Sequence, residues 1–212
     1  MASESTIGRI IAHLIKKNIV NPVSFYLKKK RIQPRSFNKH AQRWKRGMKP
    51  TNPGEMVQID HMSVSLIAGV QVKSFQAICP ITKMLFAQAY STASSNVARQ
   101  FLETARSHFP FSIKSIQVDG GSEFMSNFEQ ACKEFNIPLY VLPPKSPELN
   151  GNVERSNGSS KYEFYMFYEG DYTLFSIRKS LAKYIKKYNS YRPHQALQYL
   201  TPQQYYTSLS EA

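Results

Sequence analysis

The sequence predicts an α/β protein with a mixed sheet, in which a three-stranded antiparallel meander is followed by parallel strands and helices flank the sheet. Three observations predict this class. Successive β-like runs occupy residues 56–91, helical patterns alternate with short strands over 95–142, and the pattern is helical from 151 onward. A meander followed by crossover connections builds such a mixed sheet. A basic helical N-terminal arm and a helical C-terminal tail are expected to accompany it.

The first quarter of the chain predicts an arm and a linker. Residues 5–18 place isoleucine and leucine at helical spacing, and Asn21-Pro22 favours a second helix that continues to about Lys29. The apolar pattern then fades into a basic, proline-containing linker. Two short helices cannot bury a core alone, so we assign residues 1–52 to an arm or the remainder of a larger domain.

Three β-like runs open the predicted core. They are rich in Val, Ile and Phe, and Ala68-Gly69 and Thr82-Lys83 break them. This spacing predicts the meander. The runs are Met56–Leu66, Val72–Pro80 and Leu85–Ser91.

Helices and short strands alternate after the meander. The first helix, Ser95–Phe109, carries four inward-facing apolar residues at helical spacing. We place the core in residues 53–168 and a helical tail packed on it in 169–212. The further elements are strands at Ser115–Val118 and Leu139–Leu142, with helices at about Asn127–Phe135, Gly151–Tyr168, Leu174–Ser190 and Pro202–Ser208.

The positive charge of the chain is concentrated near its N-terminus. The net charge is +14. Residues 1–50 hold 13 basic residues and one acidic residue, which is +12, whereas residues 51–212 hold 15 basic and 13 acidic residues, which is +2. A block this basic indicates a polyanionic partner, and nucleic acid is the polyanion we expect. The alternative is a solubilising or disordered tail.

The sequence predicts neither a membrane span nor a signal peptide. No stretch of about twenty apolar residues occurs, so no membrane span is expected. The N-terminus has no signal-peptide layout. Cys79 and Cys132 are the only cysteines and sit in apolar segments. Free buried thiols in a cytoplasmic protein are the simplest interpretation.

Three acidic residues occupy informative positions. Asp60 lies within a strand pattern, on the face opposite Val57 and Ile59, where a lone charge needs a partner or a metal. Asp119 ends a strand and precedes two glycines, and Glu154 lies near the start of a helix. In the predicted fold the strand of Asp60 is central, that of Asp119 lies beside it, and the helix of Glu154 packs across both.

Converging carboxylates repel each other unless a cation lies between them. Oxygen ligands suit Mg²⁺ or Mn²⁺, and two such ions about 4 Å apart can promote phosphodiester cleavage. Each acid also has a structural interpretation: Asp60 in a core ion pair, Asp119 in a turn, and Glu154 as a charge favoured by the helix dipole. Their joint placement favours the metal site.

Four stretches of the chain resemble the retroviral-integrase-like core of bacterial insertion-sequence transposases, which has a ribonuclease-H-like fold. Together they span about residues 53–206 in the order of that family. The stretches are PGEMVQIDHM at 53–62, DGGSEF at 119–124, SPELNGNVERSN at 146–157 and YNSYRPHQALQYLTP at 188–202.

The resemblance implies a DDE-type polynucleotidyl transferase with Asp60, Asp119 and Glu154 as catalytic metal ligands. Such enzymes hydrolyse a phosphodiester at an element's end and direct the freed 3′-hydroxyl at target DNA. It also implies Mg²⁺ or Mn²⁺ as two ions, DNA as partner and a homo-oligomer when active. Two alternatives stay open: a catalytically decayed DNA-binding remnant, and a structure-selective nuclease of the same fold.

Several basic residues are candidate DNA contacts. Lys161 shares the helix face of Glu154 with Asn157 and Gly158, and can meet a phosphate or remain an ordinary solvated lysine. His61 should point to the other sheet face in a structural role. The remaining candidates are Arg155, which can reach DNA or a neighbouring acid, Arg192, whose motif suits packing of the tail or a DNA contact, and Lys28, Lys29, Lys30 and Arg31 in the linker.

The sequence departs from the family pattern at three places. Gly120 stands where Asn is usual, and Gly158 stands where a basic residue is frequent. Gly158 also weakens its helix by about 1 kcal/mol relative to Ala. The segment SESTIGRII resembles only the last helix of the helix-turn-helix region that such proteins carry upstream. We therefore expect an N-terminally truncated chain.

Overall fold

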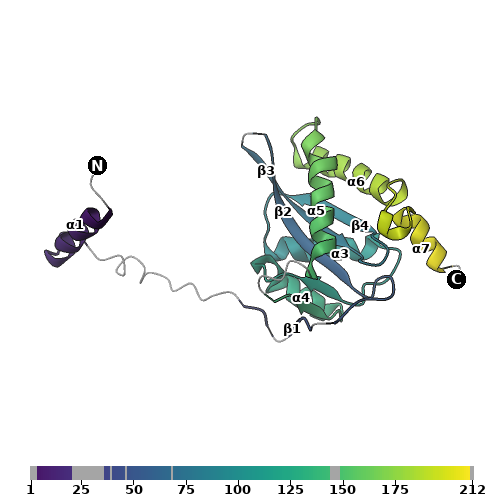
Figure 1. Ribbon diagram of the computed structural model, residues 1–212, viewed down its shortest axis with the longest axis horizontal. Helices are drawn as coiled ribbons and strands as arrows, with labels where there is room; N and C mark the ends of the chain where they lie inside the picture. The colour runs from purple at the N-terminus through teal and green to yellow at the C-terminus, as the bar shows by residue number, and fades with distance from the viewer. Residues whose placement is uncertain are drawn as a thin grey trace. The chain divides into compact units, whose positions relative to one another are not determined.

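The computed structural model describes residues 4–20, 36–38, 40–45, 47–67, 69–143 and 149–210. The chain divides into two compact units, Met1–Arg35 and Ser36–Ala212. In the first unit, α1 (Glu4–Lys16) is an amphipathic helix whose Ile7, Ile10 and Ile11 are exposed. The second unit contains the sheet (Figure 1). None of the helices within the described ranges is long and apolar enough to span a membrane.

A six-stranded mixed sheet organises the second unit, in the order β1-β6-β5-β2-β3-β4. The meander β2-β3-β4 is antiparallel, and β5, β6 and β1 join it through parallel pairs. This confirms the predicted mixed sheet of an antiparallel meander and parallel strands, in which β2 is central. The strands are β1 (Ala41–Arg43), β2 (Val57–Ile67), β3 (Val70–Ile78), β4 (Leu85–Tyr90), β5 (Ile116–Val118) and β6 (Leu139–Val141).

Helices cover both faces of the sheet (Figure 1). On one face, α3 and α4 bury a core of aromatic and aliphatic residues around Phe75 and Phe101. On the other, α5 and α6 pack on β2, β3 and β4 around Leu181. The helices are α3 (Ser95–His108), α4 (Asn127–Glu134), α5 (Gly151–Glu163), α6 (Leu174–Ser190) and α7 (Pro202–Ser210), with short 3-10 turns η1 (Ser122–Phe124), η3 (Tyr165–Phe167) and η4 (Gln195–Leu197).

Helix α5 depends on tertiary contacts for its position. Its sequence, GNVERSNGSSKYE, is rich in glycine and serine, which are weak helix formers. Val153, Ser156 and Ser160 are buried against the sheet, and the small serines allow a close approach. The helix ends at Glu163 and η3 follows, so it is shorter than the helix expected to reach Tyr168.

The segment before residue 53 differs most from expectation. Residues assigned to a basic linker contribute β1, which pairs in parallel with β6, and Trp44, which is buried against Met56 and Leu142. The boundary between arm and core therefore lies near residue 35, where the contacts divide the chain, and not at residue 52. The helix expected at about 21–29 lies outside the described residues.

Candidate active site

Asp60 in β2 and Asp119, the first residue after β5, lie near each other. Strand β2 pairs with β5 through Val57 opposite Ile116 and Gln58 opposite Gln117. Asp60 lies two residues after Gln58, and Asp119 lies two residues after Gln117, just beyond the end of β5. The charge of Asp119 acts on Asp60, as expected if this register continues. The sequence prediction for these two carboxylates is consistent with this arrangement.

The Asp60 carboxylate carries an incompletely compensated negative charge. Burial, and after it the charge of the nearby Asp119, raise the pKa of Asp60 to about 6. Oδ1 accepts a hydrogen bond from the His61 backbone N–H at 2.8 Å, and Oδ2 accepts one from Asn157 Nδ2 at 2.8 Å. These two bonds favour the charged form but do not offset the burial and the repulsion.

Glu154 lies on α5, the helix whose Asn157 bonds Asp60. It is exposed in the first turn of the helix. Asn157, one turn further along the same helix face, reaches Asp60. Within the described ranges, no three His, Cys, Asp or Glu side chains are grouped closely enough to hold a metal ion. The structure thus brings Asp60 and Asp119 together, and Glu154 lies one helical turn before Asn157 on α5.

Two buried glutamines fix the start of α5, and the sequence analysis missed both. Gln58 Nε2 and Gln117 Nε2 donate to the Leu149 carbonyl at 3.0 and 2.8 Å. Gln58 Oε1 also accepts from the Val153 backbone N–H at 3.2 Å. The repeated pattern Val-Gln-Ile-Asp and Ile-Gln-Val-Asp was the available signal, because residues two apart share a sheet face.

The donor set at Asp60 and Asp119 fits a divalent cation. Both groups are hard oxygen donors of the kind Mg²⁺ prefers. A cation between them would relieve the repulsion that raises the pKa of Asp60. Asn157 Oδ1 is buried and lacks a hydrogen-bond partner among the described atoms, so this side of the site retains acceptor capacity.

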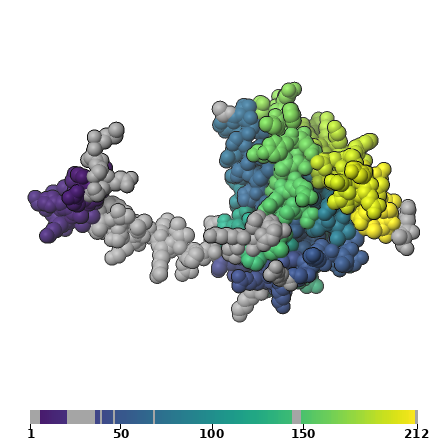
Figure 2. All heavy atoms as spheres, viewed as in Figure 1, coloured from purple at the N-terminus to yellow at the C-terminus, as the bar shows by residue number. Residues whose placement is uncertain are grey.

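The face of α5 that meets Asp60 continues toward Lys161. This lysine is exposed, with Nζ 5.4 Å from the Tyr162 ring centroid. It lines a cavity of about 460 Å³ with Tyr162, Tyr165, Met166 and residues 63–66 of β2. Along this side of α5, Glu154, Asn157 and Lys161 follow one another at helical spacing. Figure 2 shows α5 in green beside the blue β2–β3 hairpin.

His61 points to the opposite face of the sheet, as expected. Its Nδ1 lies 2.7 Å from Glu123 Oε1, and its ring stacks on Phe75 with centroids 5.2 Å apart. The hydrogen bond to Glu123 raises the pKa of His61, and the same bond keeps the pKa of Glu123 low despite burial. This pair joins β2 to η1, which begins three residues after Asp119.

The other predicted contacts lie apart from the carboxylates. Arg192 Nη2 donates to Glu163 Oε1 at 2.7 Å, and its guanidinium lies 5.2 Å from the Tyr188 ring centroid, so it ties the segment after α6 to α5. Arg155 is exposed on another side of α5. The linker residues Lys28, Lys29, Lys30 and Arg31 lie outside the described residues.

The glycines that depart from the family pattern occupy different environments. A Cβ added at Gly120 or Gly158 would meet no atom within 4 Å, so a side chain fits at either position. A Cβ at Gly121 would lie 2.9 Å from Asp119 Oδ1 and closer still to Glu123. The Gly121 backbone N–H donates to Asp119 Oδ1 at 2.9 Å, so this glycine permits the close turn around Asp119.

Part of the chain matches a known protein family, and two curated proteins are similar in sequence. Residues 136–202 match the family described as "Integrase core domain". A "Putative integrase ORF3" of Spiroplasma virus SpV1-C74 is 28% identical over 146 residues, which covers 61% of this chain and 40% of that protein. The "Insertion element IS407 uncharacterized 31.7 kDa protein" of Burkholderia multivorans is 28% identical over 159 residues, covering 74% and 56%. The chain spans about half the length of these curated relatives.

Solved structures share the fold. The catalytic core domain of HTLV-2 integrase, in complex with magnesium, superposes with a TM-score of 0.60 at 17% identity, covering 73% of this chain and 97% of that one. A chain of the simian T-cell lymphotropic virus intasome, in complex with PP2A regulatory subunit B56 gamma, superposes with a TM-score of 0.66 at 18% identity, covering 92% of this chain and 73% of that one. The resemblance drawn from the sequence motifs is confirmed.

Proposed function

Since the chain carries an integrase core like those of insertion elements and retroviruses, we propose that it is a DNA transposase. It hydrolyses a phosphodiester at the end of a mobile element and joins the freed 3′-hydroxyl to target DNA. The observation that carries this proposal is the pairing of Asp60 with Asp119 under α5, the helix of Glu154.

The proposed site holds two Mg²⁺ or Mn²⁺ ions between Asp60, Asp119 and Glu154. Such ions activate the attacking oxygen and stabilise the leaving oxygen when bound. The protein's own part is orientation. Asn157 holds the Asp60 carboxylate, and Gln58 and Gln117 hold the turn from which Glu154 projects. Exposure of Glu154 leaves its carboxylate free to complete the site when DNA and metal bind.

DNA is the proposed partner, and the active form is proposed to be a homo-oligomer. Lys161 lies on the same side of α5 as Glu154, at a distance of two helical turns, where it can meet a backbone phosphate. The basic segment Lys28–Arg31 adds contacts that are not specific for sequence.

The test is metal-dependent nicking and strand transfer on plasmid DNA carrying the sequences that flank this gene. We expect wild-type activity with Mg²⁺ or Mn²⁺ and none with EDTA. Asp60→Asn, Asp119→Asn and Glu154→Gln should each abolish activity, because each removes a charged ligand with little change of shape. Glu103→Gln is the matched control, since Glu103 lies on the opposite face of the sheet in α3.

Each outcome separates the proposal from its alternatives. A variant that retains near-normal activity removes that residue from the site. A wild-type chain that binds DNA but never nicks or joins it is the decayed remnant. Cleavage that depends on DNA structure but never joins ends is the activity of a structure-selective nuclease.

A further inference from the structure

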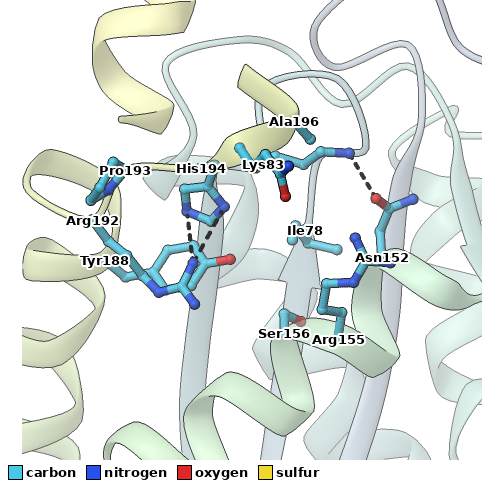
Figure 3. Close-up of a pocket in the computed structure, with 11 residues that line it drawn as sticks. Ile78, Lys83, Asn152, Arg155, Ser156, Tyr188, Arg192, Pro193, His194 and Ala196 are labelled. Carbon is cyan, nitrogen blue, oxygen red and sulfur yellow. Dashed lines mark hydrogen bonds between the residues drawn. The ribbon is translucent and has the colours of Figure 1, made fainter. Parts of the chain in front are cut away.

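A second cavity, of about 530 Å³, lies beside α5 away from Asp60. Three segments form it: the turn between β3 and β4, the start of α5, and the chain that follows α6 (Figure 3). Its size is typical of small-ligand sites, which measure about 300–1,000 Å³. It is lined by Ile78, Lys83, Asn152, Arg155, Ser156, Tyr188, Arg192, Pro193, His194, Gln195 and Ala196.

The cavity, which we term the cationic pocket, concentrates positive charge. Lys83, Arg155 and Arg192 line it, and none of its described lining residues is acidic. Arg192 is neutralised by Glu163, which does not line the cavity. Over the described part of the chain, Lys83 and Arg155 form no ion pair. Two positive charges therefore share one cavity without a counter-charge.

The positively charged groups in the cationic pocket repel one another. Burial lowers the pKa of Lys83, and the charge of Arg155 lowers it further. Burial and the charges of Arg192 and Lys83 lower the pKa of His194 to about 4, so this histidine is neutral at pH 7. An anion in the pocket would offset the repulsion between these positive charges and would raise the pKa of Lys83 and of His194.

Hydrogen bonds hold the Lys83 side chain in place at the pocket. Lys83 Nζ donates to the Pro80 carbonyl at 2.6 Å and to Asn152 Oδ1 at 2.8 Å, which fixes the ammonium while leaving its charge unpaired. Figure 3 shows Lys83 directed at Asn152, and Arg192 beside His194. Arg155 is exposed and can turn its planar guanidinium toward an oxyanion.

We propose that the cationic pocket binds a phosphodiester of DNA, with Lys83 and Arg155 as its charge partners. This inference rests on the proposed function, since it assumes that DNA lies along α5. Arg155 is the neighbour of Glu154 in α5, so a strand anchored there passes close to the carboxylates. The site is separate from Asp60 and Asp119, and it holds a flanking part of the strand.

The experiment measures binding of the full chain to a fluorescent duplex by anisotropy, in EDTA, over a range of KCl concentrations. Arg155→Gln and the double variant Lys83→Gln/Arg155→Gln are compared with wild type. We expect the double variant to bind about 5- to 10-fold more weakly and to reduce the slope of log affinity against log salt by about 0.9 for the lost phosphate contact. Arg155→Lys should retain most of the slope.

Lys133→Gln is the matched control, because Lys133 is an exposed lysine of α4 on the opposite face of the sheet. It should change affinity by less than about twofold. The single variant Arg155→Gln guards against misfolding, since Arg155 is exposed whereas Lys83 anchors a turn. Inorganic phosphate at constant ionic strength tests the other source of the same chemistry through its effect on Tm.

The results discriminate clearly. Pocket variants that bind DNA like wild type overturn the inference, and they do so independently of the proposed function if Asp60→Asn still abolishes nicking. A phosphate-dependent rise in Tm that Arg155→Gln removes, with unchanged DNA binding, also overturns it and assigns the pocket to free phosphate. Self-association lost in Arg155→Gln, with DNA binding intact, overturns it in favour of a contact between copies.

Discussion

At the scale of single residues, two buried amides, those of Gln58 and Gln117, support the site of Asp60 and Asp119 by bonding the Leu149 carbonyl. An aspartate in an apolar strand is conspicuous because its charge requires a partner. A glutamine is neutral, and nothing in the sequence shows whether its amide is solvated or bonded. Gln58 and Gln117 become informative only when the register brings both to the Leu149 carbonyl. Glu154 was placed on the correct helix, whereas its position relative to the pair depends on packing.

We predict that Gln58→Leu and Gln117→Leu each lower the rate of DNA nicking about 10- to 100-fold, the range for residues that orient a metal ligand. Each loses a bond that holds the start of α5. Circular dichroism should show a folded protein, and excess Mn²⁺ should restore part of the activity. Gln88→Leu is the control, because Gln88 bonds Tyr90 on β4 and not α5. Unchanged rates for both variants would contradict this role.

Gly158 offers a stability prediction. A Cβ there meets nothing within 4 Å, so Gly158→Ala should raise the free energy of unfolding by about 1 kcal/mol. For a domain of this size the corresponding rise in Tm is about 2–4 °C, measurable by calorimetry. Gly121→Ala is the contrast, since its Cβ would crowd Asp119, and it should lower Tm. An equal response of the two variants would be incompatible with this geometry.

At the scale of elements, the meander, the crossover helices and their order were predictable, and β1 was not. Three residues, Ala41–Arg43, show no alternation that would mark a strand. They become one because β6 pairs with them and because Glu129 of α4 binds their backbone. Glu129 lies 88 residues from Ala41, and the β6 partner Leu139 lies 98 residues from it (139 − 41). Sequence periodicity carries no information at such distances.

Glu129 therefore gives a test of β1. Its carboxylate accepts the backbone N–H groups of Asn38 at 2.6 Å and Ala41 at 2.9 Å, and its side chain is buried. Glu129→Ala should lower the free energy of unfolding by about 2–4 kcal/mol, since it leaves both donors without a charged acceptor. Hydrogen exchange at Ala41–Arg43 should accelerate. Glu134→Gln, a change at an exposed residue of the same helix, should cost less than about 1 kcal/mol. Unchanged exchange would show that β6 alone holds β1.

At the scale of the whole molecule, the two compact units carry equal net charge, unlike the two parts obtained when the sequence is divided at residue 52. Residues 1–35 hold eight basic residues and one acidic residue, or +7, and residues 36–212 hold 20 basic and 13 acidic residues, also +7. The unit that contains the sheet is thus basic itself. Hydrophobic periodicity could not place this boundary, because the segment containing β1 and Trp44 is polar.

Deletion of residues 1–35 should reduce the salt slope of non-specific DNA binding by up to about 6, since each phosphate contact contributes about 0.9. The shortened chain should keep its Tm and its residual, salt-dependent affinity. Deletion of residues 1–50 should lower Tm as well, because it removes β1 and Trp44. A slope unchanged by the shorter deletion would show that the arm contributes little to binding.

Two sides of helix α5 make different contacts. Asn157 on one side bonds Asp60, and Arg155 on another side lines the cationic pocket. Because both sides make contacts, insertions and deletions within α5 should be poorly tolerated. One residue inserted within 153–157 would turn the later part of the helix by about 100° relative to the earlier part. Asn157 would then leave Asp60, while Gln58 and Gln117 continued to hold the helix start. Natural variants of this protein should accordingly vary in length in the connection after η3, at residues 169–172, and keep α5 free of insertions and deletions.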